Sequence, residues 1–426
     1  MEGIKMKKRI SLVMAMTMAG GLLTCGNVPV LADDKVSFTI FNSKNEIQEQ
    51  LEEKVAEYGE ANNVEIEVYY SNDTVSAHLA TKYAGNDPYT LMMVDAKDVY
   101  SLGDEYAIDL SDGEWTDYTD YAITMDGQVK GFPLCIEARG LLYNADAIEA
   151  IIGRDFVPEE YATLDAFTAL LDELVEGGME APTAVQKEDW SLGAHYIQEV
   201  YEQRENPDEF IDQLYAGEVK LMEDKRFNSL MDTLDVLLKY NYAKDNAATA
   251  EREVTQQKLA SGEIAFVFDG CWAWGDVQDF EPTENLGQMP LPQNTDDDAN
   301  MKMVGGGSKY FMIDASENTS DEQRQAAKDF LNWLAMDEEG QKFLVEDCIL
   351  VSPFSNNELV AANPFGQSIK EYADNGALFD NYCYDPDDHI SVVGASMQKY
   401  LAGVIDREGL ASEMETYWST VTPVEH

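Results

Sequence analysis

Two short runs of alternating apolar and polar residues lie near the start of the chain, with a helical pattern between them. Residues 36–41 and 64–70 alternate in this way and are rich in β-branched and aromatic side chains, which indicates two strands. Residues 45–62 carry apolar side chains at helical spacing. A strand–helix–strand order is typical of parallel pairing, so the pattern predicts an α/β fold. A helix over 75–83 and a buried strand over 91–94 extend this unit.

Helical periodicity dominates the rest of the chain, and two apolar runs interrupt it. The pattern predicts helices over 164–175, 192–204, 227–240, 254–260, 321–336, 338–346 and 390–401. The apolar runs predict strands over 264–268 and 310–313. A chain of 426 residues exceeds one typical core. Because no repeat or low-complexity linker divides it, we expect two interleaved lobes, between which the chain crosses more than once.

The first 32 residues have the pattern of an export signal. Basic residues precede an apolar stretch at 10–23 that is short for a membrane span. Val30-Leu31-Ala32 favours cleavage before Asp33, whereas Leu22-Leu23-Thr24-Cys25 resembles a lipobox and would leave Cys25 lipidated. Either alternative places the mature protein outside the cytoplasm, secreted or anchored at the cell surface.

The net charge of the chain is −52, from 29 basic and 81 acidic residues. A field of this sign repels nucleic acid and anionic lipid, so we expect no nucleic-acid partner. The simplest interpretation of the acidity is a solvated surface that keeps the protein soluble.

Cysteine and histidine usage gives no sign of a metal or cofactor. No Cys-x-x-Cys motif occurs, and the whole chain has four histidines, which argues against a histidine-rich metal site and histidine-based catalysis. Export would permit disulfides, and free buried thiols are the alternative. The cysteines concerned are Cys135, Cys271, Cys348 and Cys383.

Several short motifs occur in the order found in one known family. They are Ala84-Gly85-Asn86-Asp87-Pro88, the segment from Gly131-Phe132-Pro133 through Glu137 to 142–146, residues 268–274, residues 329–341 and residues 398–403. Their order, more than any single motif, resembles the extracellular solute-binding proteins of carbohydrate ABC transporters, of which the maltose-binding protein is the best-known member. The likeness covers nearly the whole mature chain.

The resemblance implies an α/β, two-lobed, periplasmic-binding-protein-like fold of type II, with the ligand cleft between lobes joined by a multi-crossing hinge. One lobe would comprise residues 33–133 with 306–350, and the other residues 138–303 with 352–426. The implied function is capture of a carbohydrate, in particular an oligosaccharide, and its delivery to the permease subunits of an ABC importer. The implied protein is not an enzyme, and we expect it to be a monomer.

Aromatic residues provide the first candidates for contact with a sugar. A sugar ring packs its C–H face on an aromatic plane, and its hydroxyl groups need paired donors and acceptors. The resemblance implies that Trp272 stacks on the sugar, with Trp274 and Trp190 as further platforms. Asp269 ends a predicted strand and could accept from hydroxyl groups. The alternatives are tryptophans that only fill a lobe core and a carboxylate that only caps a turn.

A carboxylate inside the apolar crossover strand is a further candidate. Glu137 lies among apolar neighbours, where an unpaired charge is costly. Arg139 points to the same side of the strand two residues later. The functional interpretation is that Glu137 accepts sugar hydroxyls while Arg139 orients it. The alternative is a structural ion pair between the two.

Polar residues at strand ends complete the predicted site. In an open α/β sheet the ligand crevice lies at the carboxyl ends of the strands. This rule selects the residues after the first and third strands: Asn42, Ser43, Asn45 and Asp95. Each could instead serve a turn or a helix cap. Lys309, after a glycine run, is a further polar candidate, and contributions from Tyr382, Tyr384 and His389 stay open.

Two other functions compete with sugar capture. A secreted glycoside hydrolase also needs aromatic residues and a carboxylate pair. A binding protein for another solute, such as a polyamine or a peptide, would share the fold, and the acidic charge would suit a polyamine. The Trp272-Ala273-Trp274 motif favours a sugar.

Overall fold

The computed structural model describes residues 35–71, 73–381, 383–386 and 388–424. The predicted export signal, Cys25 and Tyr382 lie outside the described residues. Within the described ranges, no helix is both long enough and apolar enough to cross a membrane.

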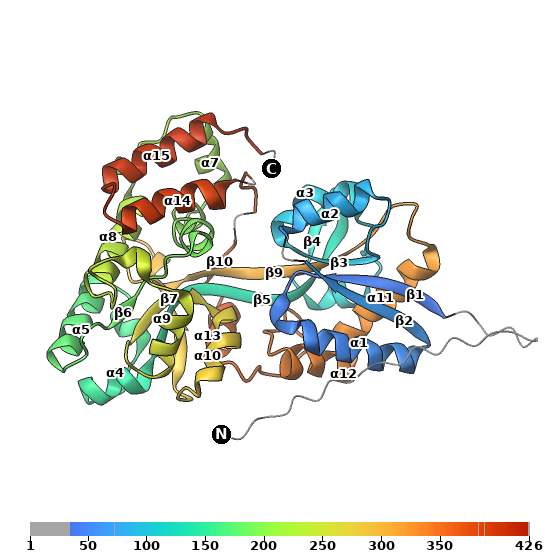
Figure 1. Cartoon of the computed structure of the whole chain (residues 1–426), viewed down its shortest axis with the longest axis horizontal. Helices are drawn as coiled ribbons and strands as arrows, with labels where there is room; N and C mark the ends of the chain where they lie inside the picture. The colour runs from blue at the N-terminus through green and yellow to red at the C-terminus, as the bar shows by residue number, and fades with distance from the viewer. Residues whose placement is uncertain (1–34, 72, 382, 387, 425–426) are drawn as a thin grey trace, which may run out of the picture. The chain divides into compact units, whose positions relative to one another are not determined.

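A ten-stranded mixed sheet forms the framework of the described chain (Figure 1). β1 pairs in parallel with β2 and β3, as the strand–helix–strand pattern predicts. The main strand order is β2-β1-β3-β9-β5-β7-β6, while β4 and β8 pair with β5 and β10 pairs with β9. The strands are β1 (Val36–Asn42), β2 (Val64–Tyr70), β3 (Leu91–Asp95), β4 (Ile123–Met125), β5 (Gln128–Asn144), β6 (Thr183–Ala184), β7 (Phe266–Gly270), β8 (Leu286–Met289), β9 (Met303–Ile313) and β10 (Leu378–Phe379).

The α-helices of the described chain pack on this sheet or, as α14 and α15 do, on other helices. They are α1 (Gln48–Asn62), α2 (Val75–Ala84), α3 (Ala96–Tyr106), α4 (Ala145–Ile152), α5 (Leu164–Glu176), α6 (Glu199–Glu202), α7 (Pro207–Tyr215), α8 (Lys225–Lys239), α9 (Arg252–Ala260), α10 (Trp274–Val277), α11 (Asp321–Met336), α12 (Glu338–Lys342), α13 (Pro364–Asp374), α14 (His389–Leu401) and α15 (Arg407–Thr420). Side-chain caps stabilise the starts of several helices. At the start of α11, for example, the Ser320 hydroxyl accepts from the backbone N–H of Gln323.

β5 and β9 are the two long strands that link the halves of the sheet (Figure 1). They run antiparallel from Phe132↔Phe311 to Arg139↔Val304. The register shifts beside Pro133, because proline has no amide hydrogen to donate to the ladder. At the far end, β5 pairs instead with β7 and β8. The expected crossover strand is therefore a continuous strand that contributes to both halves.

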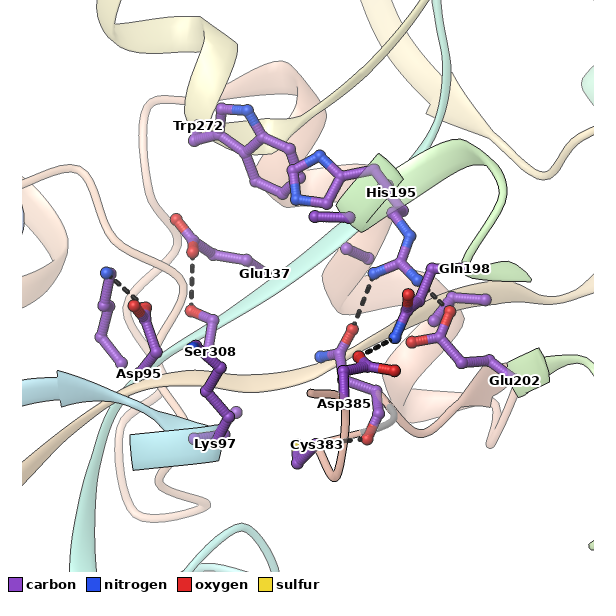
Figure 2. Close-up of a pocket in the computed structure, with 18 of the residues that line it drawn as sticks. Asp95, Lys97, Glu137, His195, Gln198, Glu202, Trp272, Ser308, Cys383 and Asp385 are labelled. Carbon is purple, nitrogen blue, oxygen red and sulfur yellow. Dashed lines mark hydrogen bonds and ion pairs between the residues drawn. The ribbon is translucent and has the colours of Figure 1, made fainter. Parts of the chain in front are cut away.

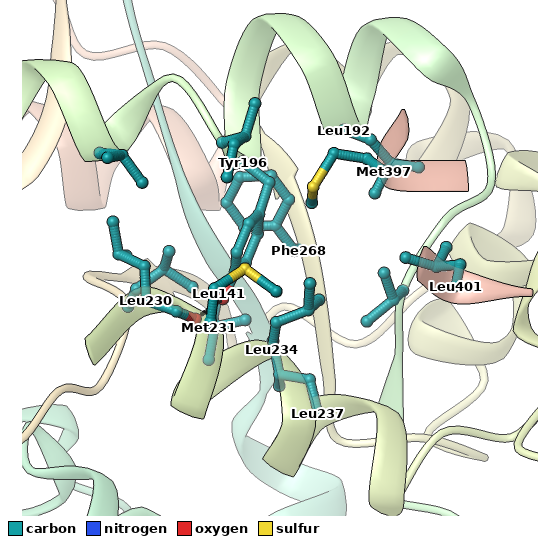
Figure 3. Packing of buried hydrophobic residues seen from close by; sticks show 14 of the residues in the cluster. Leu141, Leu192, Tyr196, Leu230, Met231, Leu234, Leu237, Phe268, Met397 and Leu401 are labelled. Atoms are coloured by element: carbon teal, nitrogen blue, oxygen red, sulfur yellow. Dashed lines mark hydrogen bonds between the residues drawn. The ribbon is translucent and has the colours of Figure 1, made fainter. Parts of the chain in front are cut away.

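Separate hydrophobic clusters lie towards the two ends of β5, one including Phe132 and the other Leu141. One contains Phe38, Phe311 and Phe330 and packs α1 and α11 against the first strands. Another includes residues of α5, α8, η4 (Ser191–Tyr196), α14 and α15. Figure 3 shows its part around Tyr196 and Phe268, where side chains of α8 and α14 meet. Burying each such large side chain stabilises the fold by roughly 1.5–3 kcal/mol.

Some predicted elements differ from the observed ones. The predicted helix over 192–204 is instead the π-helix η4 followed by the short α6. Gly193 lies within η4, and its backbone lies against Ile390 and Gly394 of α14, where a Cβ atom would come within 2.5 Å of the Ile390 carbonyl oxygen. The helix predicted over 338–346 is likewise divided: α12 ends at Lys342, and the π-helix η10 (Phe343–Asp347) follows it directly. β9 begins at Met303, seven residues before the predicted 310, and includes the whole glycine run 305–307.

Candidate ligand-binding site

A cavity of about 340 Å³ lies beside β5 and β9 and receives side chains from both halves of the sheet (Figure 2). Its wall combines charged and polar groups with one indole ring. The wall residues discussed below, which are polar, charged or aromatic, are Lys44, Asp95, Lys97, Glu137, Arg139, His195, Gln198, Glu202, Trp272, Ser308, Lys309, Asn381 and Asp385. Five of these, namely Asp95, Glu137, Arg139, Trp272 and Lys309, are among the predicted site residues.

Strand ends and the two long strands position this wall. Lys44 follows β1, and Asp95 ends β3 and caps α3 in a reciprocal capping box with Asp98. These positions are at the carboxyl ends of parallel strands, where the topology places a ligand crevice. Glu137 comes from β5 and Lys309 from β9, so the wall crosses the middle of the sheet.

Glu137 is bound to Lys44 and Ser308. The Lys44 ammonium donates to Glu137 at 2.7 Å, and the Ser308 hydroxyl donates to the other carboxylate oxygen at 2.6 Å. Burial disfavours the charge of Glu137, but the attraction of Lys44 and these hydrogen bonds outweigh it and lower the pKa. For Lys44, which is 4% exposed, burial acts against the charge but Glu137 and Glu46 together raise the pKa.

Arg139 does not orient Glu137, which corrects the role expected for it. Its guanidinium forms a buried ion pair with Glu202 and donates to the Asn381 side chain at 3.0 Å. Arg139 does line the cavity, but Glu202 and Asn381 fix its position. Strand alternation places the two side chains on the same face, yet better partners reach each of them from other elements.

Neighbouring carboxyl groups are affected by burial. Burial raises the pKa of Glu199 to about 8, and it raises the pKa of Asp385 to about 7 although the Gln198 amide donates to that carboxyl group. Glu199 lies 3.9 Å from the Arg139 Nε atom. Of these two carboxyl groups, only that of Asp385 lines the cavity.

Lys309 and Asp95 form a second ion pair at the wall. The Lys309 ammonium also lies 3.5 Å from the Ser43 hydroxyl. Burial acts against its charge, but Asp95 raises the pKa of Lys309 overall. A lysine held in this way keeps its charge and presents fixed N–H donors to the cavity.

Trp272 provides the aromatic surface of the cavity. Its ring lies 4.7 Å from that of His195, and Figure 2 shows the two rings side by side. Burial, then the charges of Arg139 and Arg252, lower the pKa of His195 well below its ordinary value. The imidazole is therefore neutral. Trp272 follows β7 through Gly270, where a Cβ atom would lie 2.2 Å from the indole.

The other predicted residues do not line this cavity. The Asn42 amide is buried and donates to the Lys44 carbonyl and to Gln48. Asn45 begins a short 3-10 helix and is exposed. Asp269 is buried and accepts from Gln186 at 2.8 Å and from Arg252 at 3.3 Å. Asn42 thus serves the turn after β1, where its side-chain oxygen accepts from the Lys44 backbone N–H at 2.9 Å. Asp269 instead belongs to a buried ion pair with Arg252, which the sequence did not predict.

Two tryptophans and the late histidine also lie elsewhere. Trp190 does not line the cavity but contacts the wall residue His195, with ring centroids 5.4 Å apart. Trp274 packs on Phe365 and lines a separate small cavity. His389 is fully buried and its Nε2 lies 3.3 Å from the Tyr201 hydroxyl, so it is a core residue.

Several wall residues were not selected from the sequence. His195, Gln198 and Glu202 recur at helical spacing among apolar neighbours, and this polar stripe was a usable signal. Lys44 and Lys97 follow strands whose neighbouring residues were selected, so the strand-end rule covered them too. No sequence pattern could have selected Asn381 and Asp385, because they lie in the irregular segment before α14.

The described part of the chain shows no arrangement suited to a resident metal. Among the described residues, no group of three or more His, Cys, Asp or Glu side chains could hold a metal ion. The cysteines Cys135, Cys271, Cys348 and Cys383 are free, which decides between the two alternatives left by the sequence.

A polar cavity with one indole platform, built where two long strands join the halves of an α/β sheet, defines a two-lobed solute-binding protein. The chain belongs to the bacterial extracellular solute-binding protein family, whose model matches residues 53–374. This confirms the resemblance drawn from the motifs.

Individual relatives agree with this assignment. The chain is 24% identical to the melibiose/raffinose/stachyose-binding protein MelE of Bacillus subtilis over 363 residues. The aligned region covers 79% of this chain and 81% of MelE. Its fold is similar to the binding protein MsmE of B. subtilis in an open conformation (TM-score 0.73, 20% identity, 90% of this chain and 97% of that chain). It is also similar to RafE in complex with raffinose (TM-score 0.72, 17% identity, 90% and 99%). RafE is also solved in an apo form from Streptococcus pneumoniae.

Proposed function

We propose that this protein captures a neutral carbohydrate outside the cytoplasm and passes it to an ABC import permease, without catalysing a reaction. The observation that carries the proposal is the Trp272 indole facing a wall of paired acids and bases. An aromatic plane takes the C–H face of a sugar, and charged partners form strong hydrogen bonds with its hydroxyls. The names of MelE and RafE, which refer to melibiose, raffinose and stachyose, support the same ligand class.

The pairing of charges favours a neutral ligand over a charged one. Lys44 pairs with Glu137, Lys309 with Asp95, and Arg139 with Glu202. A polyamine would have to displace these bases from their carboxylates, and an anionic solute would have to displace the acids. A sugar can instead form hydrogen bonds with the carboxylate lone pairs and the N–H groups that are not used within each ion pair.

The capture mechanism follows from the architecture. We propose one lobe over residues 33–133 with 306–350 and another over 138–303 with 352–426, hinged at the long strands. Ligand bound in the cavity contacts both lobes, so it stabilises the closed state by its extra affinity for that state. A permease that recognises the closed form would then receive only loaded protein, delivered as a monomer. The export signal, ending at residue 32 or before Cys25, supplies the extracytoplasmic location.

One observation favours a second candidate function. Asp385 has a pKa raised to about 7 by burial, whereas the pKa of Glu137 is lowered by Lys44 against the effect of burial. Glycoside hydrolases use one protonated and one ionised carboxyl group. Glu137 already accepts from Lys44 and Ser308, and for that reason we favour capture.

A single titration tests both candidates. We expect raffinose to change the tryptophan fluorescence of the purified protein saturably, with an affinity of roughly micromolar, about −8 kcal/mol. Chromatography of the same sample after prolonged incubation should return intact raffinose. Release of smaller sugars would show that the protein hydrolyses raffinose, and would overturn the proposal of capture without catalysis. Failure of every sugar in a panel of melibiose, raffinose, stachyose, mannotriose and chitin oligosaccharides would remove the carbohydrate proposal.

A further inference from the structure

Several carboxyl groups lie close to the Arg139 guanidinium at one end of the main cavity. Glu202 forms an ion pair with it, and Glu199 lies 3.9 Å from its Nε atom. Asp385 lines the same end of the cavity and accepts a hydrogen bond from the Gln198 amide, as Figure 2 shows. Because one guanidinium does not fully compensate several carboxylates away from water, we expect this group of acids to hold protons near neutral pH.

Two buried oxygen atoms of this wall have no hydrogen-bond partner among the described residues. One is Oε1 of Gln198, a residue that is 3% exposed, and the other is Oδ1 of Asp385. Buried polar atoms normally have a partner. The Gln198 amide donates to Oδ2 of Asp385, so Oδ1 is the oxygen that can carry a proton. Since both residues line the cavity, sugar hydroxyl groups can donate to Gln198 and accept from protonated Asp385.

Charged groups from three other elements act on Asp385. Burial raises the pKa of Asp385 to about 7, and the negative charge of Glu202 on α6 acts in the same direction. The amide hydrogen bond and the positive charges of Lys97 on α3 and Arg139 on β5 act in the opposite direction but do not outweigh burial. Cys383, on the same segment, stays uncharged because burial raises its pKa to about 12. Asp385 therefore changes its charge near neutral pH.

A sugar in the cavity favours the protonated form of Asp385. The sugar displaces water, which solvates a carboxylate more strongly than a carboxylic acid, so binding raises the pKa of Asp385 further. The ionised form would lie near Glu202 with no described cation in contact, and a neutral sugar does not supply one. Protonation of Asp385 must then strengthen sugar binding by the same factor by which the sugar strengthens proton binding.

We propose that this protein takes up a proton on Asp385 when it binds its sugar, so that it holds the sugar tightly in acidic medium and weakly in alkaline medium. Protonated Asp385 donates from Oδ1 to a sugar hydroxyl, and Gln198 holds the carboxyl group in place through Oδ2. The proposal rests on carbohydrate capture and adds that the external pH regulates it.

Calorimetric titration at several pH values tests this link. The sugar used is the one that binds most tightly among melibiose, raffinose, stachyose, mannobiose and mannotriose. Wild-type affinity should fall about fivefold or more from about pH 6 to about pH 8.5. Titrations near pH 7 in two buffers with different enthalpies of ionisation should show uptake of about 0.4 of a proton. Affinity independent of pH, or release of protons, would overturn the proposal but leave capture intact. Absence of binding by every sugar at every pH would overturn both.

Two variants assign the proton to a residue. Asp385→Asn keeps a neutral side chain with N–H donors, so it should bind within about twofold of the wild type at about pH 6 and keep that affinity at about pH 8.5. Glu199→Gln is the matched control, because burial raises the pKa of Glu199 to about 8 but its side chain does not line the cavity. It should retain the full dependence on pH.

The opposite pattern would overturn the proposal. If Glu199→Gln removed the dependence on pH and Asp385→Asn retained it, the proton would belong to Glu199. An Asp385→Asn variant that bound weakly at every pH, with the dependence on pH unchanged, would show that Asp385 contributes contacts but does not take up the proton.

Discussion

Lys44 donates a hydrogen bond of 2.7 Å to Glu137, a residue 93 positions away in the sequence. The contact joins the end of the first strand to the strand that crosses between the halves of the sheet. Both side chains are largely withdrawn from water, at 4% and 11% exposure. The pair therefore has a structural role as well as a place in the wall of the cavity.

Because of this pairing, Glu137→Gln is expected to affect folding as well as binding. The change leaves the buried Lys44 ammonium without its main counter-charge, which should lower the free energy of unfolding by about 3 kcal/mol. The double variant Lys44→Met with Glu137→Gln removes the stranded charge and should recover most of that stability, but not sugar affinity. Urea denaturation and calorimetry measure the two quantities. Full recovery of affinity in the double variant would exclude the pair from the ligand contacts.

Trp272→Ala is expected to weaken sugar binding by about 2–3 kcal/mol. The indole is only partly buried, so the melting temperature should change little. Fluorescence is unsuitable for this variant, and calorimetry is the appropriate measurement. Unchanged affinity would show that the sugar does not stack on this ring.

Gly270→Ala tests whether the position of the indole matters as well as its presence. The added methyl group would lie 2.2 Å from the Trp272 ring and must displace it. We expect a loss of affinity of at least threefold, or about 0.7 kcal/mol. Gly275→Ala is the matched control, since its new methyl group would meet nothing closer than 3.9 Å. Equal affinities for the two variants would contradict the expectation.

Asp385 should make stability depend on pH. Burial raises the folded-state pKa from 3.8 to about 7, so the folded protein binds the proton more tightly than the unfolded chain does. Its carboxyl group therefore lowers the free energy of unfolding progressively as the pH rises from about 4 to about 7. Asp385→Asn imitates the protonated form. The variant should match the wild type at low pH and melt at a higher temperature above about pH 7. A difference independent of pH would contradict this.

Cys383 should be the most accessible of the described thiols. Cys135, Cys271 and Cys348 are buried, whereas Cys383 is partly exposed at the cavity wall. Burial raises the pKa of Cys383 to about 12, so its reaction with iodoacetamide should be slow at neutral pH. Peptide mapping should find Cys383 labelled first in the native protein, and saturating sugar should slow this labelling. Labelling of Cys135 before Cys383 would contradict this order of accessibility.

Much of the fold followed from local patterns. Strand 64–70 and helix 321–336 were predicted with the bounds they have, because period and caps depend on neighbouring residues. The π-helix around Gly193 was not predicted, and α14 packs against its backbone from about 200 residues away in the sequence. Long-range packing was the missing information.

The sequence alone determined the α/β class, the family, and the strand-end and tryptophan candidates Asp95, Glu137 and Trp272. These predictions depend on periodicity, strand order and short motifs, which can be recognised from residues close together in the sequence. The tertiary structure alone decided the partners: Lys44 rather than Arg139 for Glu137, Glu202 for Arg139, and Gln198 for Asp385. A charge buried far from water takes the nearest well-oriented counter-charge in space, and spacing along the chain does not reveal which one that is.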